Sequence, residues 1–230
     1  MNESLEVLRA LEPMYQPLGH AAEAISEKNL IGFIGAFGVG KTTLIETIAR
    51  NYDSYSEVVS FTTRPTRGQG DNYRFLAHSH DTLAELATKA GRGELVNMAV
   101  HPTTGYVYGT EAEDYKTQNC MLATTSKSYE SDKNLPFLSV MPIIVVAQPD
   151  AWLERIAKRV NTVQDYSARM QEARQSLAWS LDCQDALFVD NTARNIVATG
   201  DTVVELLEGR RQQPKAGRQI AEAMLDASRV

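Results

Sequence analysis

Cysteine is scarce in this chain of 230 residues, which has only two, Cys120 and Cys183, far apart in the sequence. Neither belongs to a CxxC motif or to a cluster with histidine, the usual sources of ligands for a structural zinc ion. Two isolated cysteines also cannot supply the framework of a small disulfide-stapled protein. These observations argue against a structural zinc site and against a disulfide-stapled scaffold, and they favour a reduced, cytoplasmic protein.

Long apolar stretches are missing as well. The apolar runs near 30–34 and 143–147 are far shorter than the roughly 20 residues that a membrane-spanning helix needs. The N-terminus, MNESLEVLRA, begins acidic and amphipathic, whereas a secretory signal begins basic and then turns apolar. We therefore expect neither a transmembrane segment nor a membrane partner.

The chain also lacks an excess of basic residues. Its 23 Lys and Arg residues against 29 Asp and Glu residues leave a formal net charge of −6. Proteins that bind nucleic acids usually carry a basic face, so this charge argues against a nucleic-acid partner. Any anionic ligand must then be held by local arginines and backbone N–H groups.

What the chain does contain is a series of short apolar runs that alternate with helical patterns. Strands are expected near 30–34, 58–61, 121–124, 143–147 and 186–189, with helices at about 151–160, 165–181 and 201–208 between or after them. This alternation predicts an α/β fold with a parallel central sheet covered on both faces. Residues 63–110 are rich in Gly, Thr, Tyr and His and contain one helical pattern near 81–90, a composition that suits an inserted lobe.

A glycine-rich motif follows the first of these strands. The segment GAFGVGKT at 35–42 matches GxxxxGK[ST] at every fixed position, between an apolar strand and a helix-forming segment. Glycines let consecutive N–H groups point at phosphate oxygens, Lys41 neutralises β/γ charge, and the Thr42 hydroxyl is available to Mg²⁺. The motif predicts binding of a nucleoside triphosphate, ATP with Mg²⁺, through Gly35, Gly38, Val39, Gly40, Lys41, Thr42 and Thr43.

A second phosphate site is indicated by the segment VSFTTRPTRG at 59–68. It places Arg64 and Arg67 three residues apart beside hydroxyl side chains, and Tyr73 follows after a short polar loop. Guanidinium groups grip phosphate with two parallel hydrogen bonds, and a tyrosine hydroxyl adds a donor. Taken alone, the segment is also compatible with a solvated turn.

Together, the two motifs resemble the guanylate kinases, which phosphorylate GMP with ATP. GELVNMA at 93–99 is similar to that family's G-E-F-x-E-x-A, and GYVYGT at 105–110 looks like its G-N-x-Y-G-[ST]. The arginines of 155–170 are similar to its R-L-x-x-R-G…I-x-x-R-L lid, and LFVDN at 187–191 resembles its strand ending in N-D. The likeness spans roughly residues 30–208, in the family's order.

The resemblance implies a P-loop NTPase fold of three α/β/α layers, with a parallel sheet, an inserted lobe that binds a nucleoside monophosphate, and an arginine lid. Residues 30–208 would form the kinase-like domain, with 63–110 as the acceptor lobe and 155–170 as the lid. Residues 1–29 would be an N-terminal helical extension and 209–230 a C-terminal helical tail. Whether the chain self-associates is left open.

The resemblance also implies a role for individual residues. The acceptor monophosphate would be held by Arg64, Arg67, Tyr73 and Tyr108, and its base would face Ser60, Asn97 and Thr110. Catalysis would fall to Lys41, Arg155, Arg159 and Arg169, which supply positive charge around the transferring phosphoryl group. Asp190 or Asn191 would lie beside the adenine of ATP.

Two departures from the family concern the acceptor base. Asn97 stands where the guanylate kinases carry a glutamate that pairs with the donor edge of guanine, and an amide offers only one acceptor group. The segment CMLATT at 120–125 lacks the family's D-x-D, so Thr42 would be the main protein ligand of Mg²⁺. GMP or dGMP is the leading acceptor; another nucleotide or a small phosphorylated sugar is the alternative.

Two other functions compete with the kinase. One is a guanylate-kinase-like module that binds nucleotides or partners without catalysis, which the missing D-x-D favours and the intact Lys41 opposes. The other is a P-loop NTPase that hydrolyses ATP or GTP, for which Asp190 is the only carboxylate candidate and lies at the wrong place in the order.

Overall fold

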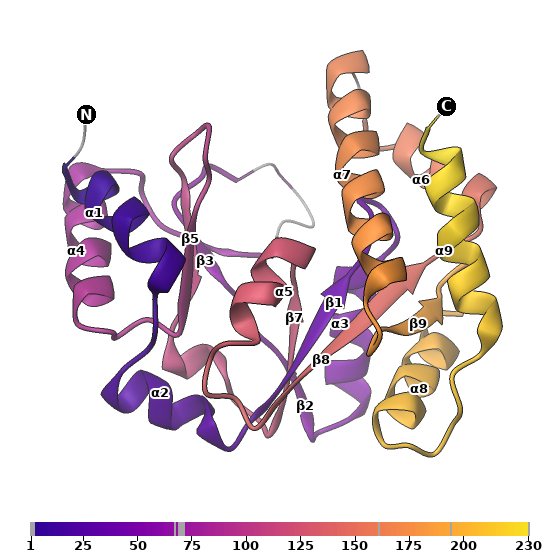
Figure 1. Ribbon diagram of the computed structural model, residues 1–230, viewed down its shortest axis with the longest axis horizontal. Helices are drawn as coiled ribbons and strands as arrows, with labels where there is room; N and C mark the ends of the chain where they lie inside the picture. Colours follow the sequence, from indigo (N-terminus) through magenta and orange to yellow (C-terminus); the bar gives the residue numbers. More distant parts are fainter. Residues whose placement is uncertain (1–2, 67, 69–71, 161, 194, 230) are drawn as a thin grey trace.

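A central parallel sheet organises the molecule (Figure 1). The computed structural model describes residues 3–66, 68, 72–160, 162–193 and 195–229. Over this part of the chain, the sheet has five strands in the order β2-β7-β1-β8-β9, all paired in parallel. Their bounds are Asn29–Ile34 (β1), Tyr55–Glu57 (β2), Asn119–Ala123 (β7), Ser139–Val146 (β8) and Leu187–Asp190 (β9).

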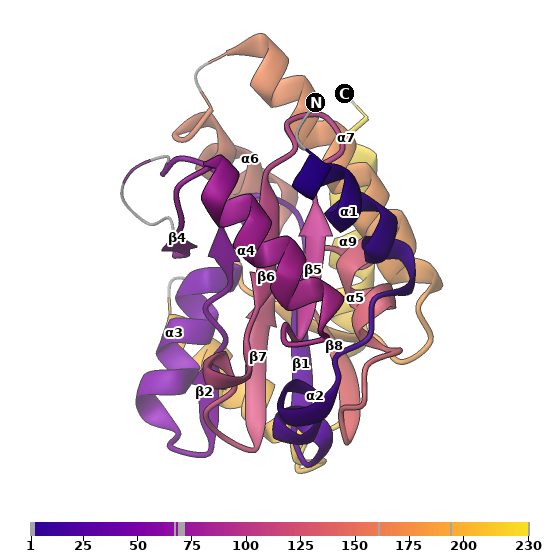
Figure 2. The same ribbon diagram turned by 90° about the vertical axis from the view of Figure 1, so that its left-hand side faces the viewer.

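Helices cover both faces of this sheet, which explains why β1 is buried at every residue after Asn29 (Figures 1 and 2). The helix after β1, α3 (Lys41–Asn51), packs against α8 (Ile196–Leu207). The others are α5 (Ser126–Asp132), α6 (Pro149–Ala157), α7 (Val163–Asp182) and α9 (Lys215–Ala227). The expected α/β fold with a helix-covered parallel sheet is confirmed.

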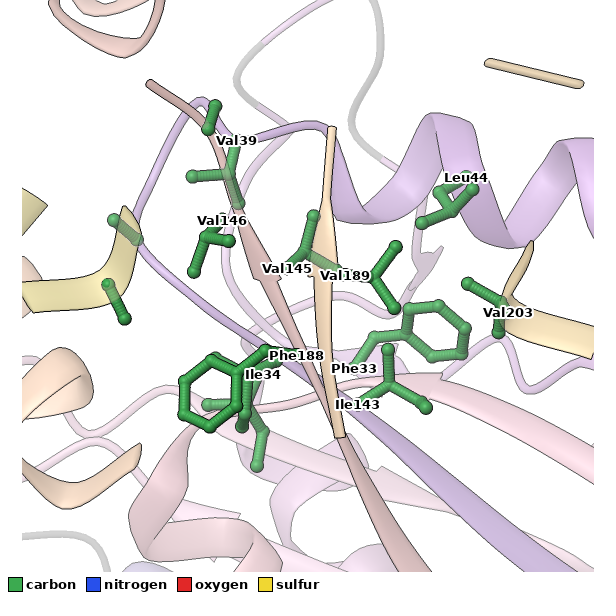
Figure 3. Packing of buried hydrophobic residues seen from close by; sticks show 14 of the residues in the cluster. Phe33, Ile34, Val39, Leu44, Ile143, Val145, Val146, Phe188, Val189 and Val203 are labelled. Carbon is green, nitrogen blue, oxygen red and sulfur yellow. The ribbon is translucent and has the colours of Figure 1, made fainter. Parts of the chain in front are cut away.

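The main core lies where β1, β8 and β9 meet these helices. Figure 3 shows the packing of side chains from all three strands around the end of β1. The labelled residues are Phe33, Ile34, Val39, Leu44, Ile143, Val145, Val146, Phe188, Val189 and Val203. Because Val39 of the glycine-rich segment is itself in this cluster, the loop that follows β1 is anchored directly to the core.

A smaller sheet is inserted between two strands that pair with each other in the central sheet, β2 and β7. In the described residues its order is β4-β3-β6-β5, with bounds Phe61–Thr62 (β3), Arg74–Phe75 (β4), Asn97–Val100 (β5) and Val107–Thr110 (β6). The helix α4 (His80–Gly91) covers it. This insertion, called the lobe below, has its own apolar cluster around Phe61, Leu86 and Leu95.

The two ends of the chain pack on different parts of the molecule. At the N-terminal end, α1 (Glu3–Leu11) lies against α4, and its Leu8 is fully buried in the lobe cluster. A 3-10 turn, η1 (Glu12–Met14), and α2 (Gly19–Ser26) lead from there to β1. At the C-terminal end, α9 packs on β8, β9 and α7, and it buries Ile220 and Met224 in the main core.

One predicted strand is wrong. The apolar run at 58–61 does not form a single strand, because the chain leaves one sheet and enters the other within it. Val58 donates its N–H to Met121 O at 2.8 Å, immediately after β2, and β3 begins at Phe61. No helix among the described residues is both long and apolar enough to cross a bilayer.

Candidate nucleotide and acceptor site

The loop between β1 and α3 takes backbone conformations that favour glycine. Gly35, Gly38 and Gly40 have φ values of +151°, +82° and +97°. A Cβ at Gly35 would lie 2.4 Å from Val145 O, and one at Gly40 would lie 2.5 Å from Asn191 Nδ2. The Gly35 contact is with backbone and leaves no room for a side chain, whereas at Gly40 the side chain of Asn191 would have to move. The positive φ values favour glycine at both positions.

Lys41 is the first residue of α3 and turns back onto the loop. Its Nζ donates hydrogen bonds to Gly35 O at 2.6 Å and to Ala36 O at 3.2 Å. Burial lowers the pKa of Lys41 to about 8; the carboxylate of Glu172 opposes this shift and the guanidinium of Arg169 adds to it. The cation is therefore partly desolvated and held by carbonyl oxygens that a phosphate group can replace.

Thr42 follows in the first turn of α3, and Thr43 after it. Thr42 is half-buried and Thr43 is exposed. Among the described residues no group of three or more His, Cys, Asp or Glu side chains is placed to hold a metal ion. The Thr42 hydroxyl is the donor that the motif itself offers to Mg²⁺, a cation that keeps several waters and binds substrate phosphates.

Asn191 and Arg155 hold the outer side of the same loop. Asn191 Nδ2 donates to Val39 O at 2.7 Å, and Arg155 Nη1 donates to the same oxygen at 3.3 Å. Arg155 Nη2 also donates to Asn191 O at 2.9 Å and to Thr192 O at 3.1 Å. In this structure the two side chains join the loop to the end of β9.

Asp190, the last residue of β9, is exposed and bound locally. Its Oδ1 accepts hydrogen bonds from Thr192 N at 2.8 Å and from the Thr192 hydroxyl. These bonds shape the turn that carries Asn191, and the predicted contact of Asp190 with adenine stays a prediction.

The other two arginines of 155–170 differ in their placement. Arg169 on α7 stacks over the ring of Phe37, 4.5 Å from its centroid, and Phe37 belongs to the glycine-rich loop. Its guanidinium also pairs with Asp165 at 3.3 Å and Glu172 at 3.0 Å. Arg159 lies beyond the end of α6 and is exposed. The fold therefore brings Arg169 into contact with the loop, and Arg159 is exposed beyond the end of α6.

The predicted phosphate-binding residues of the lobe come together around Arg64. This residue follows β3 and is only 5% exposed. Its guanidinium lies 5.0 Å from the ring centroid of Tyr73, whose ring in turn lies 5.9 Å from that of Tyr108. Arg64 Nη1 donates to Pro65 O at 3.0 Å. The prediction for Arg67 falls outside the described residues.

Two of the three predicted base-facing residues, Asn97 and Thr110, belong to one polar network. Thr110 Oγ1 donates to Asn97 Oδ1 at 2.9 Å and lies 2.9 Å from the hydroxyl of Tyr115. Asn97 Nδ2 donates to Asp132 Oδ1 at 3.0 Å. Ser60 is half-buried and lies outside this network; its carbonyl accepts from Arg74 N at 3.0 Å, at the start of β4. The structure thus links Asn97 and Thr110 to each other and to a carboxylate on α5.

Asp132 is the site residue that sequence reasoning missed. It belongs to no motif and comes from α5, 35 positions after Asn97. One signal was present in the sequence, because an aspartate in the last turn of a helix opposes the helix dipole, where cations are preferred. Because the helix itself disfavours a carboxylate at this position, interactions with other elements must account for it.

Comparisons with known proteins add no identification. The chain matches no protein-family model, and no curated protein matches it. The case for a function therefore rests on the residues and their geometry.

Proposed function

We propose that this chain is an ATP-dependent nucleoside monophosphate kinase with a P-loop fold, similar to the guanylate kinases. The observation that supports the proposal is the placement of two separate clusters of residues suited to anions on two different sheets. The glycine-rich loop with Lys41 follows a strand of the central sheet, and the Arg64–Tyr73–Tyr108 cluster belongs to the lobe. A hydrolase or a switch needs the first site but has no use for the second.

Each site has the chemistry for one substrate. At the loop, the N-terminal N–H groups of α3 and the Lys41 cation suit the β- and γ-phosphates of ATP. At the lobe, the planar guanidinium of Arg64 suits two oxygens of an acceptor monophosphate. The Tyr73 ring packs beside the guanidinium of Arg64 and limits its motion, and the Tyr108 ring packs against Tyr73 in turn.

The reaction would be an in-line transfer. An oxygen of the acceptor monophosphate forms a bond to the γ-phosphorus of ATP while the bond from that phosphorus to the β-γ bridging oxygen breaks, releasing ADP. Mg²⁺, bound by the phosphates, water and the Thr42 hydroxyl, would neutralise charge on the phosphate oxygens. Lys41 and Arg169 supply positive charge beside the loop, and Arg155 and Arg159 are proposed to join them when the segment 155–170 closes.

Lys41 must leave its present partners for this function. Its bonds to Gly35 O and Ala36 O occupy the donors that a phosphate group would take. A bound triphosphate offers stronger, charge-assisted hydrogen bonds and would raise the depressed pKa of Lys41. Because ATP and mononucleotides are cytoplasmic metabolites, we expect the protein to act there.

The test is ADP production from ATP and Mg²⁺ with GMP, dGMP, AMP, CMP, UMP, dTMP or ribose 5-phosphate, against a control without acceptor. Turnover that depends on an acceptor supports the kinase. Turnover without any acceptor indicates an NTPase, and ATP binding without turnover indicates a non-catalytic module.

One variant, with a matched control, distinguishes acceptor binding from ATP binding. Arg64→Lys keeps the charge but loses the planar fork, so we expect acceptor turnover to fall at least tenfold while ATP binding is unchanged. The matched control is Arg92→Lys, an exposed arginine of the lobe that pairs with Glu94. Equal loss of ATP binding and acceptor turnover in Arg64→Lys would contradict the assignment of two sites.

A further inference from the structure

A buried carboxylate oxygen without a partner lies beside the predicted base-facing residues. Asp132 is 2% exposed, and its Oδ1 accepts from Asn97 Nδ2. Its other oxygen, Oδ2, is buried and has no hydrogen-bond partner within the described part of the chain. Leaving a buried carboxylate oxygen unsatisfied is costly, and such groups in native proteins call for an explanation.

The neighbours of Asp132 determine how the network is oriented. Since a carboxylate accepts hydrogen bonds, Asn97 must turn its amide nitrogen toward Asp132 and its oxygen toward Thr110. Asn97 Oδ1 has a second lone pair beyond the one used by Thr110. The network therefore has unused acceptors on two adjacent residues, Asp132 and Asn97, and both are suited to N–H donors.

The network lies where the lobe meets α5. Figures 1 and 2 show β5 of the lobe beside α5, and the bond between Asn97 and Asp132 joins the two elements directly. Thr110 is fully buried and Asn97 is half-buried, so Asn97 is the more accessible of these two residues. A small opening between β5 and α5 would expose Oδ2 to a base whose edge then lies between Asn97 and Asp132.

We infer that Asp132 is a specificity-determining residue that reads, together with Asn97, a base edge carrying two neighbouring N–H donors. This rests on the proposed function. Guanine has such an edge, with N1–H beside the 2-amino group. Adenine and cytosine present one amino group beside a ring acceptor, and uracil and thymine flank their single N–H with carbonyls that a carboxylate repels. The acceptor class is therefore a guanine nucleotide.

This assignment resolves the difficulty that Asn97 raises in the sequence. An amide alone serves only one of guanine's two donors. In the structure, the second acceptor comes from Asp132, on a helix far from Asn97 in sequence and outside the motifs that suggested the acceptor site.

The experiment compares GMP with IMP, which lacks the 2-amino group, in direct binding by calorimetry without ATP and in steady-state kinetics. For the wild-type protein we expect kcat/KM and affinity at least tenfold higher with GMP than with IMP. In Asp132→Asn, an N–H donor replaces the acceptor oxygen. We therefore expect kcat/KM for GMP to fall at least tenfold, mainly through a higher KM, and the preference for GMP over IMP to disappear. The matched control is Glu130→Gln on the same helix, whose carboxylate bonds Trp179 and Lys133 and should leave both values unchanged.

Several outcomes would overturn the inference or separate it from the kinase proposal. Equal binding of GMP and IMP by the wild-type protein overturns it, even if the variant does not fold. Turnover of a different nucleotide that is unaffected in folded Asp132→Asn overturns it and leaves the kinase proposal standing. Binding of GMP that depends on Asp132 but gives no turnover supports the inference and rejects the kinase.

Discussion

The stability of the protein should depend on pH through Asp132, in a way that one variant can isolate. Burial raises the pKa of this carboxyl from its ordinary value of 3.8 to about 6, and the hydrogen bond from Asn97 only partly opposes the shift. The perturbation is Asp132→Asn, which keeps the size of the side chain and its oxygen toward Asn97 but does not titrate.

The direction follows from which state binds the proton more tightly. Above pH 6 the carboxyl is ionised in both states, and the folded state bears the full cost of the buried charge. As the pH falls from 6 toward 3.8, the carboxyl takes up a proton in the folded state while it stays ionised in the unfolded state. Wild-type protein should therefore gain stability relative to Asp132→Asn over this window.

The magnitude comes from the two pKa values. A difference between 3.8 and about 6 corresponds to about 3 kcal/mol in the free energy of unfolding. Of this, about 1.3 kcal/mol should appear between pH 7 and pH 5, and most of the rest below pH 5. The neighbouring phenol of Tyr115, whose pKa burial raises well above its usual range, stays protonated throughout and does not contribute.

The assay is urea unfolding of both proteins at pH 7 and pH 5, followed by circular dichroism. Other titrating groups are common to the two proteins and cancel in the difference. Glu130→Gln serves as the control, because Glu130 is partly exposed and its pKa is lowered by Lys133. If the stability difference between wild type and Asp132→Asn is the same at both pH values, Asp132 is not the buried, unpartnered carboxylate described above.

Three further predictions concern the loop and the lobe. Gly40→Ala forces a left-handed backbone on alanine and brings its Cβ against Asn191, so stability should fall by about 1–3 kcal/mol and ATP affinity at least tenfold; normal ATP titration would contradict the loop geometry. Arg155→Lys loses the fork that joins the loop to β9, so the KM for ATP should rise at least threefold while acceptor binding is unchanged; an unchanged KM would show that these bonds do not position the loop. Leu8→Ala should cost about 2–5 kcal/mol in urea unfolding, since Leu8 is fully buried in the lobe cluster; a loss below about 1 kcal/mol would show that α1 does not stabilise the lobe.

The parts of the fold that the sequence predicted well are those dictated by local patterns. Apolar runs bounded by turns predicted β1, β7, β8 and β9, because strands buried on both faces need continuous apolar residues. The one failure, at 58–61, comes from a run of suitable residues that the fold divides between two sheets. No local preference records where a chain passes from one sheet to another.

In the candidate site, the sequence was sufficient to predict those residues whose arrangement depends only on their neighbours in the chain. Glycine spacing and the lysine at the start of α3 predicted the loop, since its conformation depends on local φ values. The pair Arg64 and Tyr73 was predicted from nearby positions on one segment, and the structure brings the two into contact.

Only the tertiary structure decided which residues from distant segments of the chain contact each other. It turns Arg155 and Asn191 onto Val39 O, where the sequence suggested ligand contacts, and it brings Asp132 of α5 against Asn97 of the lobe. These contacts join residues that are far apart in the chain, and each follows from how helices pack on the sheets rather than from any spacing along the chain. The loop could therefore be predicted from the sequence, whereas the contact of Asp132 with Asn97 could not.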